Sequence, residues 1–267
     1  MAATAVVVED RSRRAGTELP TLTEMQIAIV TDVHGNRPAF EAVIAAAEAA
    51  GADEMWCLGD LVGYGAEPDA CVALAEEHCA VCLCGNHDLG VIGGLSLEDF
   101  SRGAKIAAEW TRDTISEDTR DFLLALHPSA EARGYGLFHA SPRDPVWEYV
   151  LSGLTAELCF DVSPFRVSFI GHSHVALSFH RPPGEPTTGS TRREGDEMDL
   201  ADGDWLINPG GAGQPRDGDP RAAWLLLDTQ ANVARWQRTE YDISAAQSAI
   251  RAARLPDSLA ERLAYGQ

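Results

Sequence analysis

Residues 25–36 read MQIAIVTDVHGN, a largely apolar run that stops at polar residues. Residues 26–31 have the length and the apolar character of a buried β-strand. Asp32 and His34 follow that strand directly. The stretch therefore predicts that the fold begins at Met25 with a strand whose carboxyl end carries a carboxylate and an imidazole.

The residues after this strand complete a strand, loop and helix unit, which the chain then repeats. Residues 36–51 space their apolar side chains as one face of a helix, with Pro38 in the first turn and Gly51 at the end. Two consecutive β-α-β units predict a parallel sheet with right-handed crossovers, in which chemistry collects at the carboxyl ends of the strands. The repeated unit comprises a strand at 54–58, a helix at 68–78 and a strand at 79–84.

Farther along the chain, the pattern changes from helices to short strands, which indicate a second sheet. Residues 182–204 are dense in Pro, Gly, Thr and acids and are expected to form a long exposed hairpin loop. The other elements that we expect are helices at 96–114, 116–126 and 244–265, the last broken at Pro256, and strands at 135–139, 166–170, 175–180, 205–207, 223–228 and 233–238.

Length and composition favour one large α/β domain over two small ones. The chain has 267 residues, of which 45% are hydrophobic. We expect a flexible extension over residues 1–24, the domain over 25–242 and a helical segment over 243–267 that packs on it.

Charge and hydropathy exclude several classes of protein. The formal charge of −20, with 41 acids against 21 bases, argues against a protein that grips nucleic-acid backbone non-specifically. No apolar run approaches the ~20 residues that cross a bilayer, and the stretch 5–8 is too short for a signal-peptide core. We therefore expect a cytoplasmic protein without a membrane partner. The six cysteines imply no disulfide framework, and Cys79 and Cys82 lack the second pair that a zinc site needs.

Five of the eight histidines fall at expected strand ends, beside acids and an asparagine. A lone buried histidine is more often a core residue than a ligand, so no single segment decides the matter. The spacing is more informative, because 24 residues separate His34 from Gly59 and again Asp60 from Gly85, which is one β-α-β length. The segments are Asp32-x-His34, Gly59-Asp60, Gly85-Asn86-His87-Asp88, His139 and Gly171-His172-Ser173-His174.

In this order the segments resemble the motifs of the calcineurin-like metallophosphoesterase superfamily, and the resemblance spans roughly residues 25–242. It implies a four-layer αββα fold, a β-sandwich of two mixed sheets flanked by helices. It also implies two divalent metal ions and hydrolysis of phosphate esters by a hydroxide that bridges them. By position, the first ion would be held by Asp32, His34, Asp60 and His174, and the second by Asp60, Asn86, His139 and His172, with Asp60 as the bridge.

These ligand types make chemical sense for a phosphoesterase. Imidazole nitrogens combined with carboxylate and amide oxygens suit Mn, Fe or Zn better than Ca or Mg. Two divalent ions, less two carboxylates and a hydroxide, leave about one positive charge that attracts a phosphate group. The site is therefore expected to be locally cationic in an acidic protein.

His87 follows a ligand but lies outside the implied coordination set. The resemblance places it at the leaving-group oxygen, so we expect it to act as a general acid, with Asp88 orienting it. A structural role beside the metals is the alternative for His87.

Departures from the family pattern indicate which branch of the superfamily the chain resembles. Phosphoprotein phosphatases of this superfamily continue Gly-Asp into a segment that ends Asp-Arg-Gly, whereas residues 59–65 here read GDLVGYG. That version, and residues 208–217, NPGGAGQPRD, look like the small bacterial and archaeal phosphodiesterase branch, although Gly211 replaces its usual Ser. Asn86 and Arg216 are the candidate substrate-binding residues; an ion pair with an acid is the alternative for Arg216.

The leading hypothesis is a phosphodiesterase that acts on a small or nucleotide-like substrate. A phosphomonoesterase or a serine/threonine protein phosphatase is the second reading. A non-catalytic interaction scaffold is the third, which is disfavoured because a scaffold needs neither seven ligands nor His87.

Overall fold

Strand β1 (Gln26–Val30) lies inside the first sheet and separates two cores. Ala28 and Val30 face the helices, whereas Ile27 and Ile29 face the second sheet, as the period of two in a strand requires. The computed structural model describes residues 24–267, so the expected extension, apart from residue 24, lies outside the described residues.

Each of the two sheets has six strands and mixes parallel with antiparallel pairs. The first, in spatial order, contains β3 (Cys79–Cys82), β2 (Glu54–Cys57), β1, β11 (Ala222–Asp228), β12 (Val233–Thr239) and β9 (Glu197–Asp199). The second contains β4 (Ser129–Ala132), β5 (Tyr135–Phe138), β6 (Val167–Phe169), β10 (Asp204–Asn208), β7 (Leu177–Arg181) and β8 (Thr188–Thr191).

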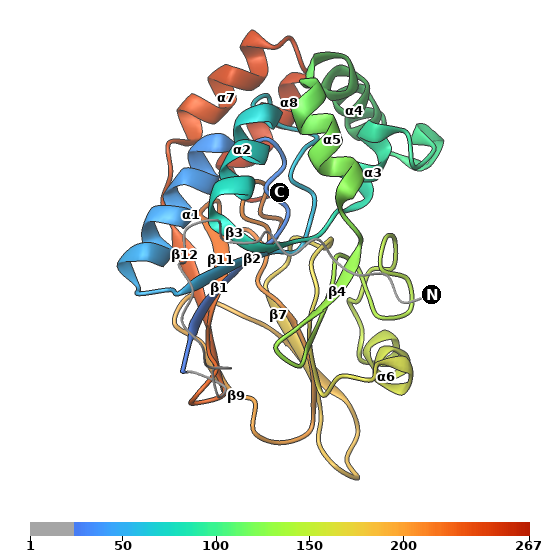
Figure 1. Cartoon of the computed structure of the whole chain (residues 1–267), viewed down its shortest axis with the longest axis vertical. Coiled ribbons are helices and arrows are strands. Elements are labelled where there is room, and N and C mark those ends of the chain that lie inside the picture. Colours follow the sequence, from blue (N-terminus) through green and yellow to red (C-terminus); the bar gives the residue numbers. More distant parts are fainter. Residues whose placement is uncertain (1–23) are drawn as a thin grey trace, which may run out of the picture.

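Helices cover the outer face of each sheet and complete four layers (Figure 1). Helix α1 (Arg37–Ala49) packs Phe40 and Val43 on the first sheet beside α2 (Pro68–His78), and α6 (Gly153–Val162) packs Phe160 on the second. The predicted α/β sandwich of two mixed sheets is therefore confirmed. The remaining helices are α3 (Asn86–Ile92), α4 (Arg102–Thr114), α5 (Glu117–Ala125), α7 (Ile243–Ala252), α8 (Asp257–Glu261) and the 3-10 turns η1 (Leu97–Asp99) and η2 (Arg262–Ala264).

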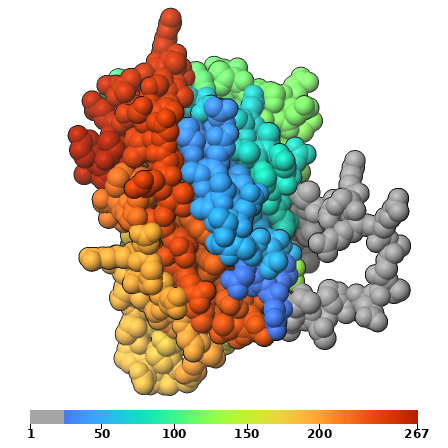
Figure 2. All heavy atoms as spheres, turned by 90° about the vertical axis from the view of Figure 1, so that its left-hand side faces the viewer, coloured from blue at the N-terminus to red at the C-terminus, as the bar shows by residue number. Residues whose placement is uncertain are grey.

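The C-terminal helices pack on the rest of the domain. Ile250 of α7 and Leu259 of α8 share an apolar cluster with Ala107 of α4. In Figure 2, α1, in blue, lies between the red C-terminal segment and the teal of α2. Among residues 24–267, no helix combines the length and the apolar composition that crossing a bilayer requires.

Five regions differ from the sequence-based expectation. The expected loop over 182–204 contains β8 and β9, which pair with β7 and β12; their side chains are mostly exposed, so no apolar alternation marks them. The helix expected from residue 96 begins at Arg102, because Phe100 is extended and Ser101 caps the helix. Strand β4 and helices α3 and α6 were not expected.

Candidate metal centre

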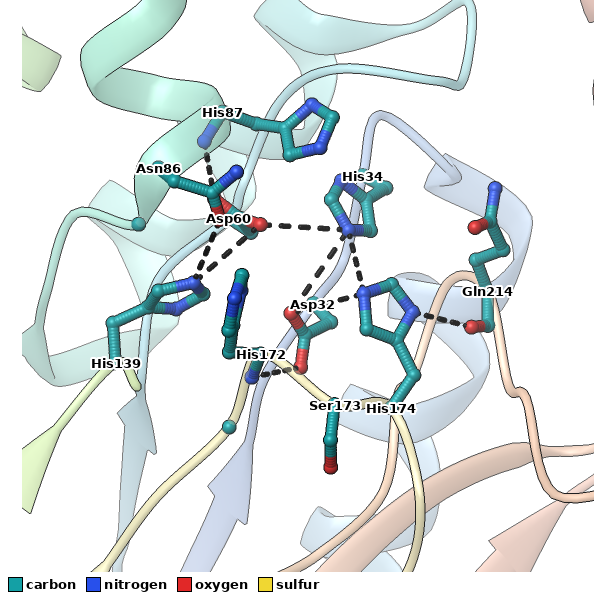
Figure 3. Close-up of polar contacts among 12 residues, drawn as sticks. Asp32, His34, Asp60, Asn86, His87, His139, His172, Ser173, His174 and Gln214 are labelled. Carbon is teal, nitrogen blue, oxygen red and sulfur yellow. Dashed lines mark hydrogen bonds and ion pairs between the residues drawn. The ribbon is translucent and has the colours of Figure 1, made fainter. Parts of the chain in front are cut away.

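The seven predicted metal ligands converge where strands of both sheets end (Figure 3). Each is at most 4% exposed. Six of them, together with His87, form three groups whose ligand atoms lie within 4.8 Å of one another: Asp32 with His34 and His174, His34 with Asp60 and His87, and Asp60 with His139 and His172. Asn86 joins them at the start of α3, where its Oδ1 lies 3.2 Å from Nε2 of His139.

The carboxylate of Asp60 lies between two groups of imidazoles. Its Oδ2 is 3.6 Å from Nε2 of His34 and 3.6 Å from Nε2 of His139. On the side of His34, Oδ1 of Asp32 is 3.3 Å from Nε2 of His174. A single oxygen of Asp60 is thus within reach of both groups, as a shared ligand would have to be.

The buried polar atoms of this centre fit divalent cations. Oδ1 of Asp32, Oδ2 of Asp60 and Nε2 of His172 are buried without a hydrogen-bond partner among the described residues. Burying an unpaired carboxylate is costly unless a cation compensates it. This set of nitrogen and oxygen donors is the type that Mn, Fe and Zn bind in proteins.

Backbone carbonyls fix the orientation of three imidazoles. Nδ1 of His34, of His139 and of His174 lies 3.1, 3.0 and 2.6 Å from the carbonyl oxygens of Val62, Leu58 and Gln214, respectively. Since a carbonyl only accepts, Nδ1 carries the hydrogen and the lone pair of Nε2 points into the centre.

Burial dominates the protonation of these side chains. It raises the pKa of Asp32 to about 7 and raises the pKa of Asp60 as well. It also lowers the pKa of His172 to about 2 and holds those of His34 and His174 well below the usual range. The imidazoles of His34, His172 and His174 are therefore neutral and ready to bind a cation, whereas the two carboxyl groups must first lose a proton.

Five of the ligands have left-handed backbone conformations, with φ of 56° at Asp32, 51° at His34, 55° at Asp60, 63° at His172 and 58° at His174. For residues with a side chain, such conformations cost of order 1–3 kcal/mol each and persist where the surroundings enforce them. Strain of this kind clusters at functional sites, so the backbone agrees with the ligand chemistry.

Two glycines give the site room. A Cβ at Gly85 would collide with Oδ1 of Asp60, and one at Gly63 would lie 2.5 Å from Nδ1 of His87. Gly63 also has φ of +88°. The Gly-Tyr-Gly segment therefore lets the ring of His87 lie against the backbone.

His87 and Asp88 differ in their surroundings. His87 donates its backbone N–H to Oδ1 of Asp60 at 2.8 Å, and Nδ1 of its buried ring has no partner among residues 24–267. Asp88 instead accepts from the backbone N–H groups of Val62 at 3.0 Å and Gly85 at 2.9 Å. Helix α3 begins at Asn86, so the carboxylate of Asp88 turns back to the helix start rather than to the ring of His87.

A pocket of about 290 Å³ opens beside the metal residues, and Arg216 lines it. The guanidinium of Arg216 donates to Oε1 of Gln214 at 2.9 Å, and no carboxylate of the described chain lies within 4.0 Å of it. Among the described residues, Arg216 thus forms no ion pair with an acid, which was the alternative to a role in substrate binding. Sequence reasoning assigned no role to eight further lining residues, which come from four stretches of the chain: Tyr64, Asp99, Phe100, Ser101, Ala104, Trp147, Tyr149 and Arg262.

Comparisons with known proteins agree with this geometry. The model of the calcineurin-like phosphoesterase superfamily domain matches residues 25–232. A metallophosphoesterase of Sphaerobacter thermophilus is 36% identical and has a TM-score of 0.83, with 92% of this chain and 100% of that one covered. An uncharacterised protein of Methanocaldococcus jannaschii is 34% identical over 251 residues, which are 92% of this chain and 100% of that protein. A hypothetical protein of Pyrococcus horikoshii, 17% identical, shares the fold with a TM-score of 0.70 over 91% and 98% of the two chains.

Proposed function

We propose that the chain, which belongs to the calcineurin-like phosphoesterase superfamily, is a phosphodiesterase for a small, nucleotide-like substrate. Members of this superfamily are metal-dependent hydrolases of phosphoric esters with dinuclear centres. The observation that carries the proposal is the position of Asp60, whose Oδ2 lies 3.6 Å from the imidazoles of two separate ligand groups.

These two groups support the metal assignments that the resemblance implies. Asp32, His34, Asp60 and His174 would hold one ion, and Asp60, Asn86, His139 and His172 the other. When bound, Mn, Fe or Zn ions supply a nucleophile near neutral pH and stabilise the charge of the phosphoryl group. The protein contributes a dry, rigid donor set, in which backbone carbonyls already orient three rings.

His87 is the proposed proton donor to the departing oxygen. Burial lowers the pKa of its ring, and the positive charge of Arg216 lowers it further. A phosphate anion beside the ring favours the protonated form, so the imidazole gains its proton when the substrate binds. Asp88 contributes by accepting hydrogen bonds from the backbone of Val62 and Gly85, which links the segment before Gly63 to the start of the helix that carries His87.

Two features support a small diester rather than a phosphoprotein. The pocket of about 290 Å³ lies near the lower end of the range for small-molecule sites. Gly63 and Tyr64 stand where protein phosphatases have an Asp that orients the catalytic His and an Arg that clamps a dianionic phosphate. Arg216 lines the pocket and could restore such a clamp, which would favour a phosphomonoesterase.

The test is to compare bis-nitrophenyl phosphate with nitrophenyl phosphate, using defined Mn, Fe or Zn, in the wild type and in Arg216→Ala. We expect a higher kcat/KM for the diester in both proteins. A wild-type preference for the monoester that Arg216→Ala removes would overturn the diesterase proposal and identify Arg216 as the clamp.

A further inference from the structure

Six rings form a continuous aromatic arc along the pocket beside the metal residues. Successive ring centroids are 4.4, 5.0, 5.3, 6.3 and 4.1 Å apart. Four of the six rings have no role in holding metal or in moving a proton, and Tyr149 is 48% exposed. In order, the arc comprises Tyr64, His87, Phe100, Trp147, His172 and Tyr149.

The loop that carries Trp147 and Tyr149 is held in place although it has no regular secondary structure. Oδ1 of Asp144 accepts from the backbone N–H groups of Val146 at 3.0 Å and Trp147 at 3.1 Å. The carboxylate of Glu148 accepts from Oγ of Ser141 at 2.6 Å. The two aromatic side chains are therefore presented by a fixed backbone, which lowers the entropy that binding a flat group would cost.

Two arginines gather over one ring of the same pocket. Cζ of Arg216 lies 5.5 Å, and Cζ of Arg262 6.0 Å, from the centroid of Tyr64. Asp99 also lines the pocket, but neither guanidinium has an Asp or Glu side chain within 4.0 Å among residues 24–267. Nε of Arg262 donates to the main-chain oxygen of Gln267. Two neighbouring cations that form no ion pair with an Asp or Glu side chain among the described residues favour an anionic group of a ligand, in addition to the one at the metals.

From this arrangement we infer that the pocket is a subsite for a nucleotide with at least two phosphate groups. The rings of Phe100, Trp147 and Tyr149 hold the base, and the guanidinium groups of Arg216 and Arg262 hold a phosphate group other than the one cleaved. Stacking on aromatic side chains accepts any base, so the site selects for a base rather than for one base. The inference rests on the proposed function, since it names the substrate class of the same site.

Binding to the metal-free protein tests the inference without turnover. Titration calorimetry would compare ADP with AMP, which lacks the second phosphate, and with pyrophosphate, which lacks the base. We expect ADP to bind roughly tenfold more tightly than either. If ADP binds no more tightly than pyrophosphate, the base has no subsite; if no more tightly than AMP, the second phosphate has none.

Variants locate the two parts of the subsite. Trp147→Leu and Tyr149→Leu should each weaken ADP binding roughly tenfold and leave pyrophosphate binding unchanged. Arg262→Gln should weaken the binding of both ligands. Matched controls are Tyr265→Leu, another exposed tyrosine, and Arg251→Gln, whose side chain pairs with Asp257; both should bind ADP as the wild type does. Full ADP affinity in Trp147→Leu and Tyr149→Leu, or in Arg262→Gln, would overturn the corresponding assignment.

Turnover separates this inference from the proposed function. Metal-loaded protein that hydrolyses bis-nitrophenyl phosphate but binds ADP no better than pyrophosphate would refute the subsite and leave the phosphodiesterase intact. Protein that binds ADP through Trp147 and Arg262 but hydrolyses no diester with any of the three metals would refute the proposed function instead.

Discussion

The pocket beside the metal residues and a second cavity differ in whether their charged side chains have partners within the protein. The second, an arginine cavity of about 520 Å³, lies between the segments 191–194 and 217–221. There, Arg221 pairs with Glu194 at 2.6 Å and Asp219 at 2.7 Å, and Arg238 pairs with Asp217. Most charged side chains that line the arginine cavity thus form ion pairs within the protein.

Several buried polar atoms of the metal centre, in contrast, have no hydrogen-bond partner among residues 24–267. Of the eight buried side-chain atoms without a partner in the described chain, four belong to Asp32, Asp60, His87 and His172, and one belongs to Asp217 of the arginine cavity. The arginine cavity is larger and more charged, yet the smaller pocket contains donors that need an external cation. The candidate active site is therefore distinguished by its buried polar atoms without partners in the described chain, and not by the volume of its pocket.

The largest effect is expected for Asp60→Ala, because one carboxylate serves both ligand groups. The variant should lose both metal equivalents, as measured by elemental analysis, and at least about a thousandfold in kcat/KM. Asp219→Ala, in the arginine cavity, should keep metal and activity. Two metals retained by Asp60→Ala would show that Asp60 is not shared.

His87→Ala should reduce the turnover of alkyl or nucleoside esters by ~10²–10⁴, the usual contribution of a general acid. Nitrophenyl esters should lose much less, because nitrophenolate leaves without a proton. Metal content should not change, since His87 is outside the proposed ligand set. A matched control is His180→Ala, whose ring stacks on Trp205 at 3.9 Å. Equal losses on both kinds of ester would assign His87 to positioning.

Metal should stabilise the protein more at high pH than at low pH. Without metal, burial raises the pKa of Asp32 to about 7 from 3.8, so the folded state holds a proton between these values that the unfolded chain has lost. That contribution to stability is complete below pH 3.8 and disappears as the pH rises through about 7. A cation must displace this proton, so metal binds best above about pH 7.

The measurement is the melting temperature with and without Mn²⁺ across pH 5 to 8, a range chosen to bracket the shifted pKa. The gain on adding metal should grow as the pH rises. Asp219 offers the contrast, because hydrogen bonds from Arg221 lower its pKa and it stays ionised throughout this range. Asp219→Asn should therefore leave the pH dependence of the gain unchanged. A gain independent of pH would contradict the protonated state of Asp32.

The smallest effects are expected in the arginine cavity. Arg238→Gln removes the partner of Asp217, whose side chain is only 12% exposed, and should lower the free energy of unfolding by about 3 kcal/mol. Arg221→Gln breaks half-exposed pairs and should lower it by less than about 1 kcal/mol. Denaturant unfolding measures both, and metal content should stay at the wild-type level. Loss of metal in Arg238→Gln would show that the two cavities are coupled.

The convergence of Asp32, Asp60 and Asn86 was predictable because they follow strands of two parallel units, whose carboxyl ends lie at one edge of the sheet. That His139, His172 and His174 would join them was implied by the resemblance to the family motifs. The observed contacts of Asp88 were not predictable, since its hydrogen bonds depend on helix α3 starting at Asn86, inside the motif. Phe100 lay in an expected helix but is extended, and this conformation lets its ring reach His87. Trp147 and Arg262 meet this pocket only through tertiary packing, which no local pattern encodes.

The left-handed ligand residues have a consequence beyond chemistry. Five strained backbones and unpaired carboxyl groups make the metal-free chain less stable than the same fold without its site would be. Metal that binds only the folded chain adds stability that grows with the logarithm of its concentration. When the metal is scarce, we expect more of the chain to be unfolded and open to proteases. Metal supply would then set how long each molecule survives in the cell, as well as how fast it works.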